Sequence, residues 1–264
     1  MLHEPYPIKK EHIHNYKENG FVKLKKVLDP DTIHFYGEEI SKKVWELNTL
    51  DIPMEERNTY QKAFMQVTNL WQASALVREF VFSKRLAGIA AALMETKAVR
   101  MYHDQALYKE ATGGVTPWHA DQFYWPLESD KTVTAWIPLQ HTPLNMGPLA
   151  FSAKSHTFTY GRDLPISDES ERKIQNALGE QGFTLLEEPF ELGEVSFHSG
   201  WTFHRAGPNT SHRPRKVMTI IYMDADMRLK EPENDNQKLD RDTWCPGART
   251  GEIIDTPLNP VLYP

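Results

Sequence analysis

The sequence predicts a mainly β fold, an antiparallel sandwich or barrel that is buttressed on one side by helices. From about residue 98 onward, short runs rich in β-branched and aromatic residues follow one another between turn signals. The first quarter of the chain instead carries apolar residues at the spacing of amphipathic helices. Helices followed by many short strands are typical of a β core that is supported on one face.

Helices are expected at four places in the chain. Ile13 and Tyr16 indicate a first helix that stops at Gly20, and a capping sequence DPD at 29–31 begins a second one. The second helix carries a periodic apolar row, Ile33, Tyr36, Ile40, Val44 and Leu47. Leu86, Ile89 and Leu93 mark a helix within 83–95, and Ile174, Ala177 and Leu178 mark one at about 168–178.

The strands are read from alternation and from β-rich runs. GFVKLKKV at 20–27 alternates like an edge strand with its lysines turned outward. The later runs are VRMYHDQALYK, TVTAWIPL, GPLAF, GEVSFH and KVMTIIYM. The polar stretch EPENDNQ at 231–237 is expected to be a surface loop.

We expect one domain, because the chain has no internal repeat, low-complexity tract or Pro/Gly/Ser-rich linker. The interpretation divides residues 1–264 into a helical support of about 1–97, a β core of about 98–225 and a C-terminal extension of about 226–264.

Composition narrows the class of protein. With 264 residues, 40% hydrophobic and 11% aromatic content, the chain is expected to fold around a sizeable core. The net charge of −6 argues against a nucleic-acid or acidic-membrane surface. The start MLHEPYPIKK has no apolar signal region, and no apolar run is long enough to span a bilayer, so a cytoplasmic protein is expected.

The single cysteine limits the kinds of metal site. Cys245 cannot form an internal disulfide and is expected to be a small packed residue. One cysteine also excludes a zinc ribbon or an iron–sulfur cluster, so any metal must be held by His and carboxylate side chains.

The stretch WHADQFYW at 118–125 contains a candidate ligand pair, His119 and Asp121. In a chain with 11 histidines the His-x-Asp pattern alone is weak evidence. At the end of a strand, however, alternate side chains point the same way, and a third ligand can come from a distant strand. His204 is the best candidate for it; His198, within GEVSFH, is expected to be a strand histidine or an outer neighbour of the site. Two His and one carboxylate are the ligand set of non-haem Fe(II) oxygenases.

An ordered set of motifs resembles the phytanoyl-CoA dioxygenase family of Fe(II)- and 2-oxoglutarate-dependent oxygenases. The motifs are KENGFVKLKKVLDPDTI, HADQ, AWIPL, NMGPL, KSH, FHSGWTFHRAGPN, RPRKVMTIIYMD and the ending DTPLNPVLYP. The resemblance covers nearly the whole chain and implies a double-stranded β-helix, a jelly-roll or cupin-like barrel, buttressed by N-terminal helices. Lys154 stands where some members have Gly, a departure that concerns a turn.

The resemblance also implies the cofactors and the residues that bind them. Fe(II) is expected at His119, Asp121 and His204, with 2-oxoglutarate and O₂ as cosubstrates. Arg215 matches the family's arginine for the far carboxylate of 2-oxoglutarate, and Arg213 is its rival. The catalytic set is therefore His119, Asp121, His204 and Arg215; the further cosubstrate contacts are Trp136, Gln105 and, as a weaker candidate, Lys109.

The implied reaction is hydroxylation of an unactivated C–H bond of a small molecule, with release of succinate and CO₂. Related halogenases lack the carboxylate ligand, so Asp121 argues against halogenation. Phe123, Tyr124, Trp125 and Trp201 are equally consistent with a substrate pocket and with a barrel core. No Gly-rich phosphate loop is present, so the family name does not imply a CoA thioester. The partners expected are a small-molecule substrate, no nucleic acid and no membrane; the oligomeric state stays open.

Two other classes of function remain. One is a cupin-like metal enzyme that does not use 2-oxoglutarate, which would not need Arg215. The other is a non-catalytic small-molecule-binding protein on the same barrel, which would tolerate the loss of a metal ligand. Since the fold does not separate these classes, the ligand and arginine positions must.

Overall fold

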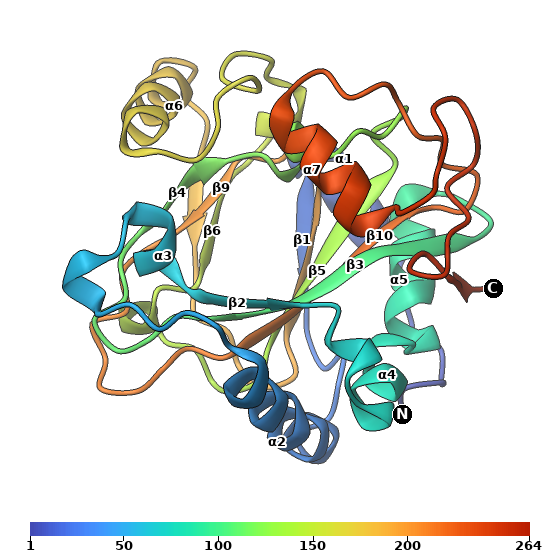
Figure 1. Cartoon of the computed structure of the whole chain (residues 1–264), viewed down its shortest axis with the longest axis horizontal. Coiled ribbons are helices and arrows are strands. Elements are labelled where there is room, and N and C mark those ends of the chain that lie inside the picture. Colours follow the sequence, from blue (N-terminus) through green and yellow to red (C-terminus); the bar gives the residue numbers. More distant parts are fainter.

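A computed structural model describes residues 1–264 and shows two antiparallel sheets with a cavity between them (Figure 1). The larger sheet has seven strands in the order β1-β8-β5-β10-β3-β11, with β2 also paired to β3. Its strands are β1 (Phe21–Leu24), β2 (Met65–Thr68), β3 (Val99–Tyr108), β5 (Thr132–Pro138), β8 (Val195–Ser199), β10 (Val217–Asp224) and β11 (Val261–Tyr263). The smaller sheet has four strands in the order β4-β9-β6-β7, namely β4 (Thr116–His119), β6 (Leu149–Ser152), β7 (Leu185–Glu187) and β9 (His204–Ala206).

The expected β fold with supporting helices is confirmed, and the predicted β-rich runs form β3, β5, β6, β8 and β10. Hydrogen bonds do not close the strands into a ring: the two sheets remain separate, so the architecture is an open sandwich of the jelly-roll type. This architecture matters for function because side chains from both sheets line the cavity between them.

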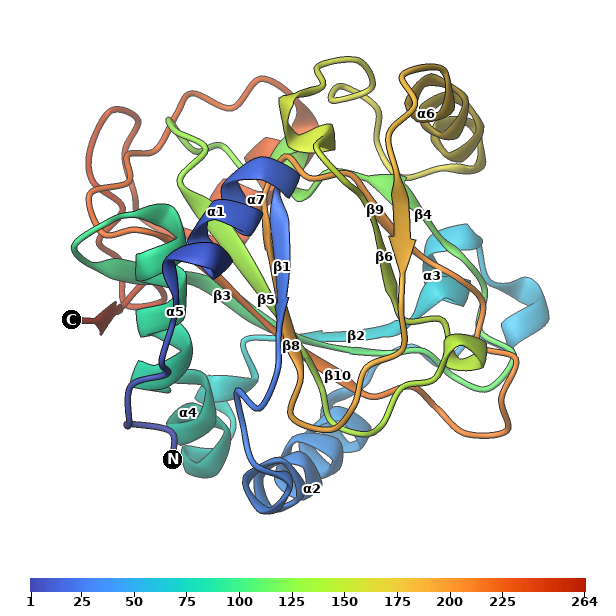
Figure 2. The same cartoon turned by 180° about the vertical axis from the view of Figure 1, so that it is seen from behind.

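The seven helices are α1 (Lys10–Asn19), α2 (Pro30–Leu47), α3 (Thr59–Ala63), α4 (Ala75–Val81), α5 (Lys84–Met94), α6 (Asp168–Glu180) and α7 (Asp235–Trp244). Four of them, α1, α2, α4 and α5, pack against the outer face of the larger sheet (Figure 2), whereas α3 and α6 lie beside the smaller sheet. The DPD sequence caps α2 as expected: the Asp29 carboxylate accepts a 2.6 Å hydrogen bond from the Thr32 amide, and Pro30 occupies the first helical position. None of the helices has the length and apolarity needed to span a membrane.

Strand alternation divides the side chains of the larger sheet between a helix-facing core and the cavity. On β5, Val133, Ala135 and Ile137 belong to the main hydrophobic core, together with Ile33, Ile40 and Val44 of α2 and Leu86 and Ile89 of α5. Thr134 and Trp136, the intervening residues, line the cavity. Both faces of the central strands are therefore buried, which explains why KVMTIIYM and TVTAWIPL are almost continuously apolar.

The helix α7 corrects the interpretation of 231–237 as a loop. The Asn234 side chain accepts a hydrogen bond from the Gln237 amide, so the second half of that polar stretch is the cap and first turn of a helix. Polar side chains that hydrogen-bond to the backbone are favoured at helix caps as much as in loops. The polar composition of 231–237 therefore did not distinguish a helix cap from a loop. The short helices α3 and α4 were not expected either.

Three local features agree with the sequence interpretation. The chain leaves α1 at Gly20 in the left-handed conformation, with φ of 82°. Lys154 also has a left-handed backbone, with φ of 69°, so the position taken by Gly in some family members is one that favours Gly. Cys245 is fully buried, and burial raises the pKa of its thiol.

Lys109, directly after β3, is a fully buried amine. It donates hydrogen bonds to the carbonyl oxygens of Gly114 and Gly207, and its nitrogen lies 3.3 Å from the Thr116 hydroxyl oxygen. Burial, with a smaller contribution from the positive charge of Arg215, lowers the pKa of Lys109 to about 6. The amine thus joins three segments of chain, and all its identified partners are protein oxygens.

Gly20 provides a test of the turn between α1 and β1. A Cβ added there would lie 2.5 Å from Thr202 Oγ1 and 2.6 Å from His156 Nδ1, at a φ of +82°. Gly182 has a similar φ of +69° but open space around it. We expect Gly182→Ala to lower the free energy of unfolding by about 1 kcal/mol, and Gly20→Ala to lower it by at least about 1 kcal/mol more. Urea denaturation of both variants checks this; equal losses would contradict the close packing.

Lys109 gives the protein a specific dependence of stability on pH. Between the folded pKa of about 6 and the unfolded value near 10, unfolding takes up a proton at this amine. The contribution of Lys109 is therefore least favourable at low pH and improves as pH rises, by up to about 1.4 kcal/mol per pH unit. We expect urea denaturation between about pH 7 and 9 to give a steeper rise in stability for the wild type than for Lys109→Met. Parallel pH profiles would show that the amine is not held neutral.

Candidate metal centre and the cavity around it

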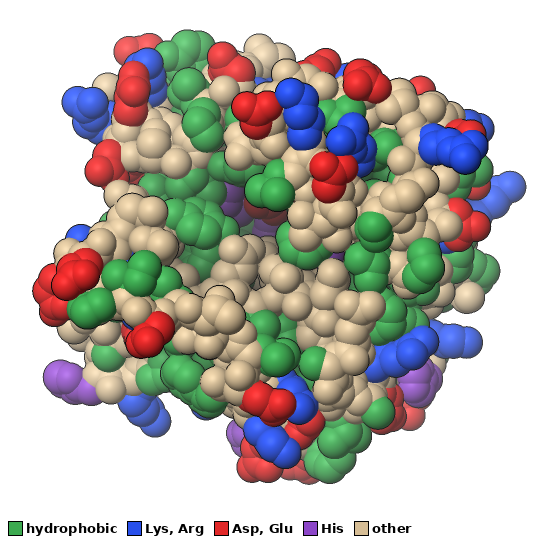
Figure 3. Space-filling view, in the orientation of Figure 1, with side chains coloured by type: hydrophobic (Ala, Val, Ile, Leu, Met, Phe, Trp, Pro, Cys, Tyr) green, Lys and Arg blue, Asp and Glu red, His purple; other side chains and the backbone are tan.

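A cavity of about 490 Å³ lies between the two sheets, with histidine and acidic side chains visible deep inside it (Figure 3). The smaller sheet contributes residues of β4, β6 and β9, and the larger sheet contributes residues of β3, β5, β8 and β10. The strand pairing therefore brings side chains from distant parts of the sequence together around one cavity.

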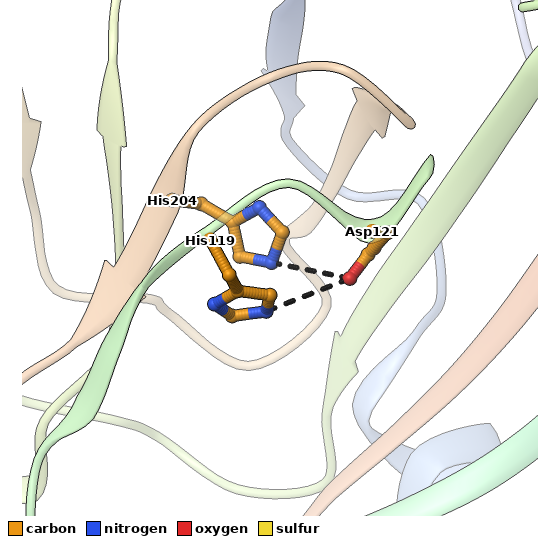
Figure 4. A group of neighbouring side chains, drawn as sticks. All are labelled: His119, Asp121 and His204. Carbon is orange, nitrogen blue, oxygen red and sulfur yellow. Dashed lines mark ion pairs between the residues drawn. The ribbon is translucent and has the colours of Figure 1, made fainter. Parts of the chain in front are cut away.

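His119, Asp121 and His204 converge at this cavity (Figure 4). His119 Nε2 lies 3.5 Å, and His204 Nε2 3.6 Å, from the same carboxylate oxygen, Asp121 Oδ1. One ligand atom from each residue falls within 4.8 Å of the others. Three ligand atoms this close together can share a single metal ion.

Strand pairing positions the two histidines. His119 is the last residue of β4 and His204 the first of β9, and the antiparallel register sets them directly opposite each other. Asp121 differs slightly from expectation: it begins a short 3-10 helix, Asp121–Tyr124, just after the strand end. Ala120 is still extended, with φ of −121° and ψ of 126°, so the alternation that aims His119 and Asp121 the same way is kept.

Backbone carbonyls fix the tautomers of both histidines. His119 Nδ1 lies 2.7 Å from the Pro117 carbonyl oxygen, and His204 Nδ1 lies 2.9 Å from that of Thr202. A carbonyl only accepts, so Nδ1 of each ring carries the proton. Each Nε2 is left with a lone pair directed at the space beside Asp121, which is the state that a metal ligand needs.

The pKa values of the group favour the same protonation states. Burial, and next the neighbouring His119, hold the pKa of His204 well below its usual value, so this ring is neutral. Burial acts to raise the pKa of Asp121, but the imidazoles around it, His204 foremost, hold it well below its usual value. A carboxylate anion beside imidazole nitrogens with free lone pairs is the donor set of a divalent transition metal.

The outer oxygen of Asp121 has its own partners. Thr134 donates a hydrogen bond of 3.2 Å to Asp121 Oδ2, and His198 Nε2 lies 3.3 Å from the same oxygen. His198 Nδ1 is buried without a partner. His198, on β8, thus lies behind the carboxylate rather than within the group of three, as the sequence interpretation expected of an outer neighbour.

Arg215 lies in the same cavity as a buried cation without an acidic partner. Its side chain is 2% exposed, one terminal nitrogen donates to the Gly147 carbonyl, and Nε has no partner. No carboxylate lies within ion-pair distance of it, and burial lowers the pKa of Arg215 to about 9. A guanidinium buried in this way is costly unless an anion joins it.

The other expected cosubstrate contacts divide into two groups. Trp136 and Gln105 both line the cavity; the Trp136 ring centre lies 5.4 Å from the Arg215 guanidinium, and Gln66 donates a 2.5 Å hydrogen bond to Gln105. Lys109 is not part of the lining, because its amine is directed at three protein oxygens. The suggestion that Lys109 contacts a cosubstrate is not supported by this position.

Arg213, the rival of Arg215, is exposed and lies outside the cavity lining. Of the aromatic residues flanking the predicted ligands, Tyr124 and Trp125 line the cavity. Phe123 and Trp201 do not; Trp201 instead lies 4.3 Å under the Arg162 guanidinium.

Sequence reasoning missed several residues of the cavity. Thr134 could have been found, because it lies two positions before Trp136 on the same face of β5. No pattern in the sequence indicated the contributions of α3 and α7, which are Tyr60, Asn236, Leu239, Asp240 and Trp244. These helices are distant in sequence from the motifs, and only the tertiary fold brings them to the cavity.

The chain matches known proteins in both sequence and structure. The family model described as Phytanoyl-CoA dioxygenase (PhyH) matches residues 16–217. The 1-deoxypentalenic acid 11-beta-hydroxylase of Streptomyces exfoliatus is 25% identical over 217 residues, which cover 75% of this chain and 74% of that protein. A probable alpha-ketoglutarate-dependent hypophosphite dioxygenase of Stutzerimonas stutzeri is 25% identical over 135 residues, but the match spans only 48% of this chain and 46% of that protein.

A solved structure shares the fold over nearly the whole length. The epimerase SnoN, in complex with Fe3+, alpha ketoglutarate and nogalamycin RO, superposes with a TM-score of 0.80 at 23% identity, covering 96% of this chain and 98% of that one. The family match extends from α1 to the start of β10 and includes the group His119, Asp121 and His204. The chain therefore belongs to the phytanoyl-CoA dioxygenase (PhyH) family of iron- and 2-oxoglutarate-dependent dioxygenases.

Proposed function

We propose that this protein holds Fe(II) through His119, Asp121 and His204, binds 2-oxoglutarate through Arg215, and hydroxylates a C–H bond of a small-molecule substrate. The observation that carries the proposal is the presence, in one cavity, of a group of two histidines and one carboxylate together with a buried guanidinium that has no counter-ion. The histidines and the carboxylate suit a divalent metal. The guanidinium suits one end of a dianion whose other end binds that metal.

The donor set supports iron as the metal. Two imidazole nitrogens and one carboxylate oxygen suit Fe(II), and they occupy one side of the ion so that positions remain for other ligands. Thr134 and His198 hold Asp121 with its free oxygen toward the histidines. Because these partners restrict the carboxylate before a metal arrives, little ordering is needed on binding.

Arg215 supports 2-oxoglutarate as the cosubstrate. Its free Nε and terminal nitrogens can donate to both oxygens of a carboxylate, and the Trp136 ring beside it shields that contact from water. Gln105, held by Gln66, provides a polar group on the wall formed by β3. We place Trp136 and Gln105 beside the cosubstrate and leave Lys109 out.

Bound iron and 2-oxoglutarate together supply the oxidising power: O₂ gives one oxygen atom to succinate, with release of CO₂, and the other to the substrate C–H bond as a hydroxyl. The protein's part is to bind and orient. Arg215 neutralises and aligns the cosubstrate, while the apolar walls of the cavity exclude water from the reacting region. Asp121 occupies the position that halogenases leave vacant, which supports hydroxylation.

The two alternative classes fit less well. A metal enzyme that does not use 2-oxoglutarate leaves the buried charge of Arg215 without any partner. A non-catalytic binding protein has no need for two histidines with matched tautomers aimed at one carboxylate oxygen. Both features cost stability or ordering unless they are used.

The metal ligands can be tested without a substrate. We expect His119→Ala and Asp121→Asn to weaken Fe(II) binding by more than the roughly 10- to 100-fold that loss of an outer partner causes. Anaerobic equilibrium titration with Fe(II) measures this. His103→Ala is the matched control, because His103 is buried and lines the same cavity outside the group of three. Unchanged iron affinity in Asp121→Asn would refute the assignment.

The role of Arg215 can be tested by titrating the iron-loaded protein with 2-oxoglutarate under anaerobic conditions. Loss of a buried charge pair costs at least about 2 kcal/mol, so Arg215→Met should raise the dissociation constant of 2-oxoglutarate about 30-fold or more. Quenching of tryptophan fluorescence is a suitable signal, since Trp136 neighbours the guanidinium.

Arg213→Met serves as the control for Arg215, because Arg213 is exposed and belongs to the same basic run. Without 2-oxoglutarate, Arg215→Met should be at least as resistant to urea as the wild type, because it removes an uncompensated buried charge. If Arg213→Met, and not Arg215→Met, weakens cosubstrate binding, the assignment is wrong.

A further inference from the structure

The cavity extends well beyond the metal ligands and the cosubstrate arginine. Its other half is walled by α3, by the segment around Pro165 and Ile166, and by α7. Aromatic and apolar side chains dominate it, namely Tyr60, Phe64, Tyr124, Trp125, Leu239 and Trp244. This half can accept the body of a substrate, and its walls suit a flat or ring-bearing molecule.

The charges in the lining are unevenly distributed. Arg215 is the only Lys or Arg among the residues that line the cavity, and it is assigned to 2-oxoglutarate. Asp121 is assigned to the metal, which leaves Asp240 as the one remaining carboxylate. His103, the histidine of this half, is neutral, because burial lowers its pKa to about 4. An anionic substrate would therefore meet a carboxylate and no cation.

Asp240 lies on α7 without a cationic partner. The Tyr102 hydroxyl donates a long hydrogen bond of 3.4 Å to its Oδ2, and the carboxylate forms no ion pair with a Lys or Arg. Burial raises the pKa of Asp240 to about 7, which expresses the cost of holding this charge in an apolar wall. A neighbouring acid, Asp242, shows the contrast: it is exposed and paired with Arg241 at 2.7 Å.

Aromatic rings accompany this carboxylate. Trp244 follows Asp240 by one helical turn and is stacked on His103, with ring centres 4.4 Å apart and planes inclined by 20°. The hydrogen-bond donor of Asp240, Tyr102, is itself aromatic, and Tyr124 lines the same half of the cavity. A carboxylate beside aromatic faces is a combination that binds ammonium groups, through an ion pair and cation–π contacts.

We infer that Asp240 is a specificity-determining residue and that the substrate is a ring-bearing, mainly apolar molecule with a protonated amine. The inference rests on the proposed function, since it assigns Arg215 and Asp121 to the cosubstrate and the metal.

Isothermal titration calorimetry on the anaerobic protein loaded with Fe(II) and 2-oxoglutarate tests the inference with defined probes. Two ring series are used, each with an amine, an alcohol and a carboxylate on the same skeleton: benzylamine, benzyl alcohol and benzoate, and the three naphthalene analogues. We expect the amine to bind most tightly and the carboxylate most weakly in at least one series. Asp240→Asn should weaken amine binding about 10-fold or more and leave the alcohol unchanged.

Asp242→Asn is the matched control, because it makes the same change two positions along α7 at an exposed side chain. Asp240→Asn should unfold at no lower urea concentration than the wild type, since it removes a half-buried charge that has no cationic partner. The inference is overturned if no amine binds more tightly than its alcohol and carboxylate analogues, or if both Asn variants weaken the amine equally. The iron and 2-oxoglutarate titrations contain no amine, so they show separately whether the proposed function holds.

Discussion

The antiparallel pairing of β4 with β9 is the constraint on which the site depends. It sets His119 opposite His204, although 84 other residues separate the two in the chain, and each ring is then fixed by a carbonyl of its own segment. The same segment is tied to the N-terminal part of the protein, because Thr202 donates a 2.7 Å hydrogen bond to the Gly20 carbonyl. The helical support therefore positions the metal ligands indirectly, through the turn that follows α1.

A second constraint is the placement of unpaired charge inside the cavity. Arg215 is buried and Asp240 is half-buried, both line the same cavity, and neither has a partner of opposite charge. Proteins that only need stability avoid such groups. Here the folded chain is held together elsewhere, by the apolar core between the larger sheet and the helices α2, α4 and α5. That core allows the cavity to carry charges that become favourable only when ligands bind.

The sequence predicted the parts of this arrangement that local patterns encode. Runs of β-branched and aromatic residues between turn signals located β3, β5, β8 and β10, and the ordered motifs identified the histidines, Asp121 and Arg215 as a group. The sequence did not predict the features that depend on long-range geometry. These are the open sandwich, the contacts of the Lys109 amine with three protein oxygens, and the position of Asp240, which α7 brings to the cavity. Each of these depends on how distant segments pack, and α7 begins inside a polar stretch that composition assigns to a loop.

The most direct test of the account is the visible absorption band of an iron-bound 2-oxo acid. It is recorded by adding 2-oxoglutarate to the Fe(II)-loaded protein without oxygen, in the wild type and in His204→Ala. The account predicts a weak band that saturates with 2-oxoglutarate in the wild type and is absent in the variant. An iron-loaded wild type that gives no band, or a band that persists unchanged in His204→Ala, would contradict it.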